Sequence, residues 1–328
     1  MTDKQIKNII FKIQLNAFDA KRKCLYKDCE EISIKSHLLQ KKGIINSISE
    51  NNHVYELAIN PFAEGKHKFT NTGINEVFTF PGFCTTHDNN IFKEIESGDV
   101  SFFDYRTQLL LSYRAVMNEK RKKEIIIDYF NRILNSATLK QYLATEYFQR
   151  IKGSIQQQKL GIDDQTYYEI FFLSNINNTD NRDFSFLTIE IPRIEFCSSA
   201  VVSYETTDEI NQIYFFKGPN TKEPLTEIYF NLLPLEEKSI IIIGCLNLRK
   251  DKCWEFIKSF DGDTTEKTLK KISDLLLYQV ENWLCSPSIY RDYLKSKEHE
   301  IIRIVNESTI HTDERRELDF NLFEGIEM

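Results

Sequence analysis

The sequence is poor in the residues that mark disordered or low-complexity chains, with 11 glycines and 7 prolines among 328 residues. Hydrophobic residues make up 41% of the chain and aromatic residues 12%, which is enough to build buried cores. A disordered or fibrous protein is therefore excluded. A chain of this length is typical of two domains or of three small ones.

Long apolar stretches are also missing. No run approaches the roughly 20 consecutive apolar residues that a membrane-spanning helix needs, and the first residues lack the apolar core of a signal peptide. We therefore expect a cytoplasmic protein that makes no contact with a membrane. The odd number of cysteines, seven, fits this expectation because it disfavours a disulfide framework. Cys197 and Cys245 lie in apolar, strand-like runs, where we expect buried, unreactive thiols.

The sequence has no overall excess of basic residues, and its net charge is −7. Residues 1–100 carry 13 Lys+Arg and 13 Asp+Glu. Residues 101–328 carry 29 Lys+Arg and 36 Asp+Glu, and so account for the whole net charge of −7. A strongly basic nucleic-acid-binding domain is therefore excluded. Contact with nucleic acid would need a local patch, although such residues are equally typical of solvated surface. The candidates are Lys21, Arg22, Lys23, Lys27, Lys35, Lys41 and Lys42.

The motifs of several large enzyme classes are absent as well. The sequence contains no GxxxxGK[ST] phosphate-binding loop, no GxGxxG, no GxSxG nucleophile motif and no HExxH metal motif. Residues 167–300 show no catalytic constellation, so an enzyme with its site in that region is the weakest of the hypotheses.

Four potential metal ligands are present, in two short-spaced pairs far apart in the sequence. Cys24 and Cys29 form the first pair, and Cys84 and His87 form the second, which the pattern places in the first turn of a helix. Zinc takes such sets in tetrahedral structural sites, and a helix N-terminus favours the thiolate form of cysteine. We predict structural zinc at these four residues, contributing folding energy directly. The alternative is a set of buried cysteines with a surface histidine.

This arrangement resembles the zinc-stapled HNH, or ββα-metal, nucleases, which are built on a treble clef. The resemblance rests on the cysteine knuckle, on a strand that ends in Ser36-His37, and on Cys-x-x-His at a helix start. It covers about residues 20–97. In that family the zinc is structural, and the histidine that closes the first strand is the general base that activates water for attack on phosphate.

The resemblance implies His37 as the general base. It also implies a separate Mg²⁺ or Mn²⁺ ion, approached by Asp88 and by Asn89 or Asn90 on the helix. The plainer interpretation is that these three residues cap or neutralise the start of a helix.

Two positions depart from the family pattern. Ser36 stands where the family usually has Asp or Glu, and serine is a poor ligand for Mg²⁺. Ile91 stands where the family often has Lys, His or Asn. A structural role for His37, including replacement of His87 as the fourth zinc ligand, is therefore an open alternative.

Hydrophobic periodicity predicts the remaining elements. The expected helices are 4–20 (alternatively extended), Leu38–Glu50, a hairpin over 104–153 broken at Ser136, Lys252–Phe260, Thr265–Cys285 and a segment from Ser286 to Val305. The expected strands are Glu31–Lys35, His53–Ile59, Glu76–Phe80, Tyr167–Leu173 (alternatively helical), Phe184–Ile191, Glu195–Tyr204, Gln212–Lys217, Glu227–Leu233 and Ser239–Leu246. Residues 60–76 read as an exposed loop, and 312–328 as a loose acidic tail.

Together these expectations describe an α+β protein. Its parts are a zinc-binding HNH-like treble-clef domain (1–100), a helical spacer (101–165), a domain with an antiparallel sheet and flanking helices (166–310) and an acidic tail (311–328).

The expected function is that of a metal-dependent nuclease or nucleic-acid-binding protein. Residues 36–40 and 80–88 also resemble a group of bacterial proteins without an assigned activity, and some HNH-like proteins serve in phage defence. The alternative is a non-catalytic zinc-stabilised interaction or sensing module, with a C-terminal domain that binds a ligand, a protein partner or a second copy of the chain.

Overall fold

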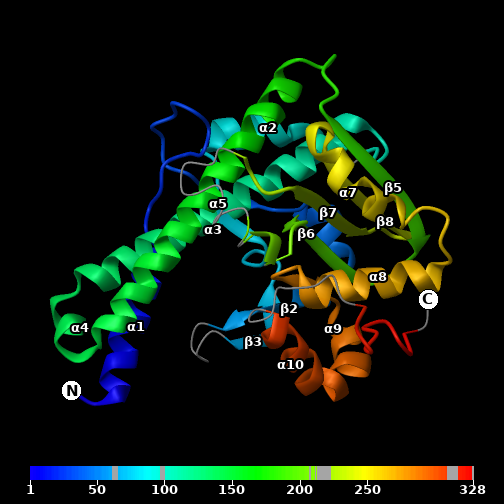
Figure 1. The fold of residues 1–328 in the computed structure, drawn as a ribbon. Helices are drawn as coiled ribbons and strands as arrows, with labels where there is room; N and C mark the ends of the chain where they lie inside the picture. The colour runs from blue at the N-terminus through cyan, green and yellow to red at the C-terminus, as the bar shows by residue number, and fades with distance from the viewer. Residues whose placement is uncertain are drawn as a thin grey trace. The chain divides into compact units, whose positions relative to one another are not determined.

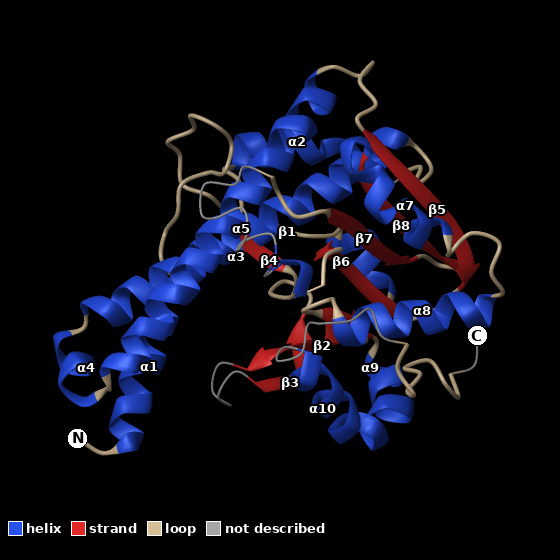
Figure 2. Ribbon diagram, in the orientation of Figure 1, coloured by secondary structure: helices blue, strands red, loops and turns tan. Residues whose placement is uncertain are grey.

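The computed structural model of this chain is a mixed α+β structure (Figures 1 and 2). It describes residues 1–60, 66–96, 100–206, 208–210, 212, 223–308 and 317–326. The chain forms two compact units. The first unit comprises Met1–Ser36, Phe80–Ile91 and Val116–Ile170, and the second comprises His37–Thr79, Phe92–Ala115 and Phe171–Met328. Each unit is therefore assembled from segments that are far apart in the sequence.

The first unit is mainly helical. Helix α1 (Asp3–Phe18) begins with a capping box, in which the Thr2 side chain accepts from the Gln5 N–H and the Gln5 side chain accepts from the Thr2 N–H. Its isoleucines pack against a small buried cluster on the helices that follow. That cluster comprises Ile133, Leu139, Ile151 and Ile155, with Ile6, Ile9, Ile10 and Ile13 of α1 against it.

The expected helical hairpin is confirmed. Helix α3 (Tyr105–Asn135) ends at Ser136, the predicted break, whose hydroxyl caps α4 (Ala137–Tyr142) by accepting from the Leu139 N–H at 3.3 Å. The chain then returns in α5 (Thr145–Asn177). The strand reading of Tyr167–Leu173 is wrong and its helical alternative is right, because the residues continue the apolar face of α5.

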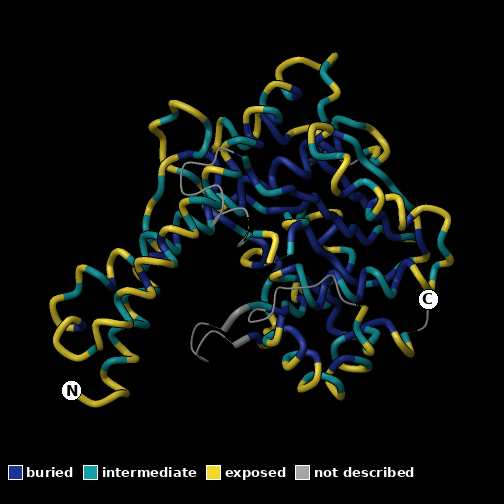
Figure 3. The backbone as a smooth tube through the Cα atoms, viewed as in Figure 1, coloured by how far each residue is buried: buried dark blue, intermediate teal, exposed yellow. Residues whose placement is uncertain are grey.

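The second unit is built on a seven-stranded antiparallel sheet with the order β3-β2-β9-β6-β7-β8-β5. Its strands are β2 (His53–Asn60), β3 (Lys66–Gly73), β5 (Phe184–Pro192), β6 (Phe196–Ser203), β7 (Glu227–Pro234), β8 (Lys238–Leu246) and β9 (Trp283–Cys285). Every residue of β7 is buried and all but the first of β8 (Figure 3). The near-continuous apolar run of β8 is what such a central strand requires.

Helices complete this core. Side chains of α7 (Lys250–Lys258), α8 (Thr265–Tyr278) and α10 (Glu298–Ser308) join the strands in one buried apolar cluster. The short helix α9 (Pro287–Ile289) contacts β2 and leads through a π-helical turn, Tyr290–Leu294, and a 3₁₀ turn, Lys295–Lys297, into α10. A further 3₁₀ turn, Asn247–Arg249, precedes α7.

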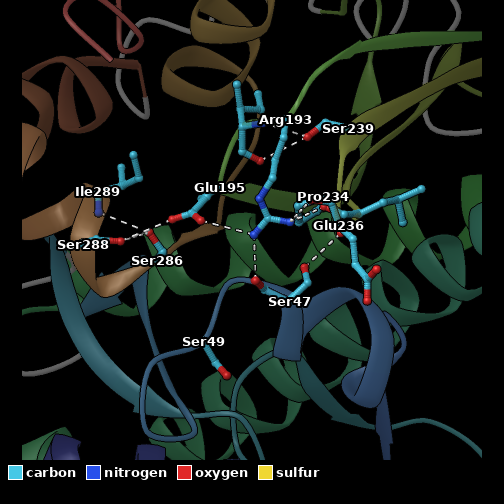
Figure 4. A network of polar contacts seen from close by, with 12 residues as sticks. Ser47, Ser49, Arg193, Glu195, Pro234, Glu236, Ser239, Ser286, Ser288 and Ile289 are labelled. Carbon is cyan, nitrogen blue, oxygen red and sulfur yellow. Dashed lines mark hydrogen bonds and ion pairs between the residues drawn. The ribbon is translucent and has the colours of Figure 1, made fainter. Parts of the chain in front are cut away.

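Arg193, in the turn between β5 and β6, ties several loops of the second unit together (Figure 4). Its Nη2 donates to the Ser47 carbonyl at 2.8 Å and to Glu195 Oε1 at 3.2 Å, while Nη1 donates to the Leu235 carbonyl. The Ser288 hydroxyl in turn donates to Glu195 Oε2 at 3.3 Å. The guanidinium thus satisfies carbonyl groups that no strand ladder reaches.

A two-stranded sheet of β1 (Lys35–His37) and β4 (Thr79–Pro81) precedes helix α2 (Thr85–Glu96). This confirms the helix beginning after Cys84 and a strand ending in His37. That strand begins only at Lys35, so the predicted strand Glu31–Lys35 overlaps it at one residue, and the predicted strand Glu76–Phe80 overlaps β4 only at Thr79 and Phe80. The predicted helix Leu38–Glu50 contains a π-helical turn, Lys41–Ile45, and is otherwise mostly irregular.

Several predicted elements differ from the structure. Residues 66–73, expected in a loop, form the edge strand β3. Its buried side chains are His67 and Phe69, and since only Phe69 is apolar the sequence shows no apolar alternation. The predicted helix Thr265–Cys285 ends at Tyr278, and its last residues form β9. The strand predicted at Gln212–Lys217 falls, apart from Gln212, outside the described residues.

The end of the chain is also better packed than expected. Within the described residues 317–326, Leu322 and Phe323 are buried in the core of the second unit, and the Leu322 N–H donates to the Ser273 hydroxyl at 2.8 Å. Because this segment is rich in acidic residues, nothing in the sequence indicated that Leu322 and Phe323 would be buried. Among the described residues, no helix combines the length and hydropathy needed to cross a bilayer.

Candidate metal centre

The four predicted zinc ligands come together in the first unit. The sulfur atoms of Cys24, Cys29 and Cys84 and a ring nitrogen of His87 all lie within 4.8 Å of one another. The Cys29 and Cys84 sulfurs are 3.9 Å apart. His87 Nδ1 lies 3.5 Å from the Cys24 sulfur and 3.2 Å from the Cys84 sulfur.

These separations fit a tetrahedral ion. With Zn–S bonds of about 2.3 Å, a tetrahedral zinc site holds its sulfur ligands roughly 3.8 Å apart, and sulfur–nitrogen pairs slightly closer. Three thiolates and one imidazole are also the soft donors that zinc prefers over Mg²⁺ or Ca²⁺. The cluster could therefore hold a metal ion such as zinc.

The first ligand pair lies on a knuckle fixed by backbone hydrogen bonds. The Cys24 N–H donates to the Glu31 carbonyl at 2.8 Å, next to a β-bridge between Lys23 and Ile32. The loop between the cysteines turns at Asp28, whose φ of 60° lies in the left-handed region that aspartate tolerates better than most residues. This turn directs the Cys29 thiol back toward Cys24.

The second ligand pair is held by the chain just before α2. The Leu25 N–H donates to the Gly82 carbonyl at 2.9 Å, and the Ile34 N–H donates to the Phe83 carbonyl at 2.8 Å. These bonds join the knuckle to the segment that carries Cys84. At Gly82 a Cβ atom would lie 2.5 Å from the Phe80 ring, so glycine permits this close turn.

Helix α2 then places His87 one turn after Cys84, and the Asp88 N–H donates to the Cys84 carbonyl at 2.9 Å. The His87 ring stacks on Tyr26, with ring centroids 4.0 Å apart and planes inclined by 16°. Tyr26 lies between the two knuckle cysteines in sequence, and it fixes the imidazole orientation that aims Nδ1 at the sulfurs. No pattern in the sequence points to this role for Tyr26.

Without a bound metal, deprotonation of a buried thiol in this cluster is unfavourable. Burial, more than the nearby Glu31 and Cys24, raises the pKa of the Cys84 thiol to about 11. A bound cation would reverse this preference, because metal coordination takes the thiolate and not the thiol.

Two arginines support the knuckle, and neither was predicted. Arg121 of α3 donates from Nη2 to the Lys23 carbonyl at 2.5 Å. Arg22 donates from Nη2 to the Ala17 carbonyl at 2.6 Å and to Asp128 Oδ2 at 3.0 Å. Burial lowers the pKa of Arg121, and the neighbouring Glu124 carboxylate opposes that effect. Nothing local in the sequence links Arg121 to a knuckle that lies so far from it along the chain.

His37 lies in the second unit and has its own surroundings there. Its Nε2 lies 3.2 Å from the Ile74 carbonyl, which can only accept, so Nε2 carries the proton of the neutral ring. Burial lowers the pKa of His37 below its ordinary 6.5, with the Ile74 carbonyl acting in the opposite direction and Lys41 in the same one. The half-buried imidazole is therefore neutral at physiological pH, and Nδ1 carries the lone pair.

The remaining implied residues belong to the first unit. Asp88 and Asn89 follow His87 in α2, and Asp88 Oδ1 is buried without a hydrogen-bond partner among the residues that the structure describes. Ser36 is 1% exposed, and its hydroxyl likewise has no partner in the described part of the chain. Ile91 is buried in the apolar interior.

No protein-family model, curated protein or solved structure matches this chain. The interpretation of the site therefore depends on its own geometry.

Proposed function

We propose that this chain is a zinc-stapled, HNH-like protein that acts on nucleic acid by metal-dependent phosphodiester cleavage. The Cys24, Cys29, Cys84 and His87 cluster carries the proposal, because a compact Cys₃His set built from a knuckle and a helix start is what the resemblance requires. Zinc bound there would contribute to folding and not to chemistry, since all four positions are taken by protein ligands.

His37 is the general base in this proposal. The Ile74 carbonyl holds the Nε2–H tautomer, which leaves the Nδ1 lone pair to take a proton from the attacking water. The lowered pKa of His37 keeps that lone pair available at neutral pH. The proton moves from water to Nδ1 as the water oxygen attacks phosphorus, and the P–O bond to the leaving oxygen breaks with its electron pair remaining on that oxygen.

Asp88 and Asn89 are the residues proposed to hold a divalent cation. The partnerless, buried Oδ1 of Asp88 and the amide oxygen of Asn89 are hard oxygen donors of the kind that Mg²⁺ or Mn²⁺ takes. Such an ion, when bound, supplies stabilisation of the charge that develops on the leaving oxygen.

The second candidate is a zinc-stabilised module that binds nucleic acid or a protein partner without cleaving anything. The observation that favours it is the pair Ser36 and Ile91, a hydroxyl and a buried alkyl group at two positions where the nuclease family places metal-binding or polar side chains. This candidate shares the zinc site and differs only in the chemistry at His37.

A cleavage assay separates the two candidates. We expect the zinc-loaded protein to nick supercoiled plasmid DNA with Mg²⁺ or Mn²⁺, and His37→Ala to lose about 10²–10⁴-fold of that rate while retaining zinc. His53→Ala is the control, because His53 is exposed and its Nδ1 is bonded to the Asn51 carbonyl at 2.9 Å. Undiminished cleavage by His37→Ala would rule out its role as base. A wild-type protein that binds nucleic acid in a salt-sensitive way without cleaving it supports the second candidate.

The pH profile gives an independent check. Since burial lowers the pKa of His37 below 6.5, the imidazole remains a base at pH 6.5 and the acid limb of kcat/KM should lie below that value. An acid limb above pH 6.5 would assign the essential base to another group.

A further inference from the structure

Arg121 is a buried cation beside the metal cluster. Its side chain is only 5% exposed, although it lies on a helix that the sequence assigns to a spacer. Nη2 donates to the carbonyl of Lys23, the residue directly before Cys24, and Nη1 donates to Glu124 Oε2 at 2.6 Å. The partner carboxylate is 31% exposed, so solvent screens it more than it screens the guanidinium.

We propose that Arg121 is a positioning residue of the metal centre. Its guanidinium fixes the peptide that leads into Cys24, and its charge offsets the net negative charge of the filled site. The inference rests on the proposed structural zinc. It assigns to α3, from Val116 onward, a part in metal binding that lies outside residues 20–97, over which the chain resembles the HNH family.

The charge balance explains why a cation is needed. A zinc ion with three thiolates and a neutral imidazole carries a net charge of about −1, and Cys24 and Cys84 are both buried. A buried, uncompensated charge costs several kcal/mol. An arginine retains its charge when buried and reaches a carbonyl with a fixed geometry, which a lysine does not do.

A second arginine at the knuckle, Arg22, donates to the Ala17 carbonyl and to Asp128, and so links the end of α1 to α3. It pairs with Asp128 at 3.0 Å, and the second oxygen of that carboxylate takes Arg132 at 2.9 Å. The rotation of α3 that aims Arg121 at the knuckle is fixed by the preceding residue. Lys120 forms a mostly buried ion pair with Glu169 of α5, with Nζ and Oε2 2.5 Å apart. This ion pair with α5 therefore helps to hold the orientation of Arg121 on α3.

Zinc affinity of the full-length protein tests the proposal. We expect Arg121→Met, which retains an apolar stem of similar length, to bind zinc about 10–100-fold more weakly in competition with a colorimetric chelator. The zinc affinity of Arg121→Lys should lie between those of Arg121→Met and the wild type, because lysine retains the positive charge but lacks the planar guanidinium donors. Arg150→Met, which removes an exposed arginine of the same unit, should match the wild type.

A second measurement separates a role toward the metal from a general structural role. In urea unfolding, Arg121→Met should destabilise the zinc-loaded protein more than the chelator-treated protein, because the charge it offsets is present only in the loaded site. Equal losses in both states, or wild-type zinc affinity in Arg121→Met, would overturn the proposal. Should Arg121→Met fail to fold, the same two measurements on Arg121→Lys decide it. A wild-type protein without bound zinc refutes the zinc site itself, whereas zinc that is insensitive to Arg121 refutes only this inference.

Discussion

The two units of this protein are stabilised in different ways. The second unit buries a broad apolar core between its sheet and helices, in which strands β7 and β8 are covered on both faces. The first unit has a small cluster centred on Ile133, Leu139, Ile151 and Ile155, together with ion pairs such as Lys120–Glu169 and Arg22–Asp128. The four metal donors also lie in this unit.

This difference shows why a metal site belongs in the first unit. A unit with a small apolar cluster gains little from burial to offset the loss of chain entropy, and cross-links such as metal ions add to its stability. The bonds that join the knuckle to the segment before α2 are few, and the segments they connect are remote in sequence. A metal ion would join the knuckle to the start of α2 at a single point. In the second unit, by contrast, strand pairing joins segments that are remote in sequence.

The largest expected effect comes from removing one donor, with Cys84→Ser. We expect loss of bound zinc and a large loss of stability in the first unit, because structural zinc contributes an apparent binding free energy of about 10–16 kcal/mol in zinc-finger peptides. Hydrogen exchange followed by mass spectrometry should show lost protection around residues 22–34 and 82–91, with β7 and β8 still protected.

Cys197→Ala is the control for that experiment. Cys197 is equally buried but lies in β6, away from the donor cluster, so this variant should retain its zinc. Zinc retained at full occupancy in Cys84→Ser, or protection lost equally in β7 and β8, would contradict the assignment of the metal to the first unit.

The next largest effect is expected in the other unit, with Trp283→Ala. Trp283 is fully buried on β9, and its ring lies 5.5 Å from that of Phe69 and 5.6 Å from that of Phe196. Its removal should cost about 3–5 kcal/mol of unfolding free energy through the cavity it leaves. Denaturant unfolding should show the loss while zinc content stays at the wild-type level. Leu248→Ala, at a side chain that is 67% exposed, should change neither.

The sequence predicted those parts of the fold that local patterns determine. Strands β5, β6, β7 and β8, the hairpin break at Ser136 and the helix beginning after Cys84 all follow from periodicity and turn residues. The donor cluster was predictable for the same reason, because each ligand pair is short-spaced. The choice between His87 and His37 as the fourth ligand was not predictable, and the structure groups His87 with the three cysteines.

The elements that sequence reasoning missed depend on distant partners. Strand β3 is polar and is strand-like only because β2 pairs with it, and β9 is three residues inserted between β2 and β6. Leu322 and Phe323 lie in an acidic segment and are buried because the core of the second unit accepts them. Arg121 belongs to the same class, since only the folded structure brings it to Lys23. The catalytic grouping of His37 with Asp88 and Asn89 stays a prediction.

The smallest effect is also the most direct comparison of the units, because a capping hydroxyl is removed in each. Ser136 caps α4 in the first unit, with its hydroxyl 3.3 Å from the Leu139 nitrogen, and Thr264 caps α8 in the second, with its hydroxyl 3.4 Å from the Lys267 nitrogen. Substitution of either by alanine should cost about 1 kcal/mol. If metal and apolar core stabilise separate units, Ser136→Ala shifts only the chelator-sensitive unfolding transition and Thr264→Ala only the insensitive one. If both variants shift one common transition by the same amount, the units unfold together, and chelation should then destabilise the sheet as much as the knuckle.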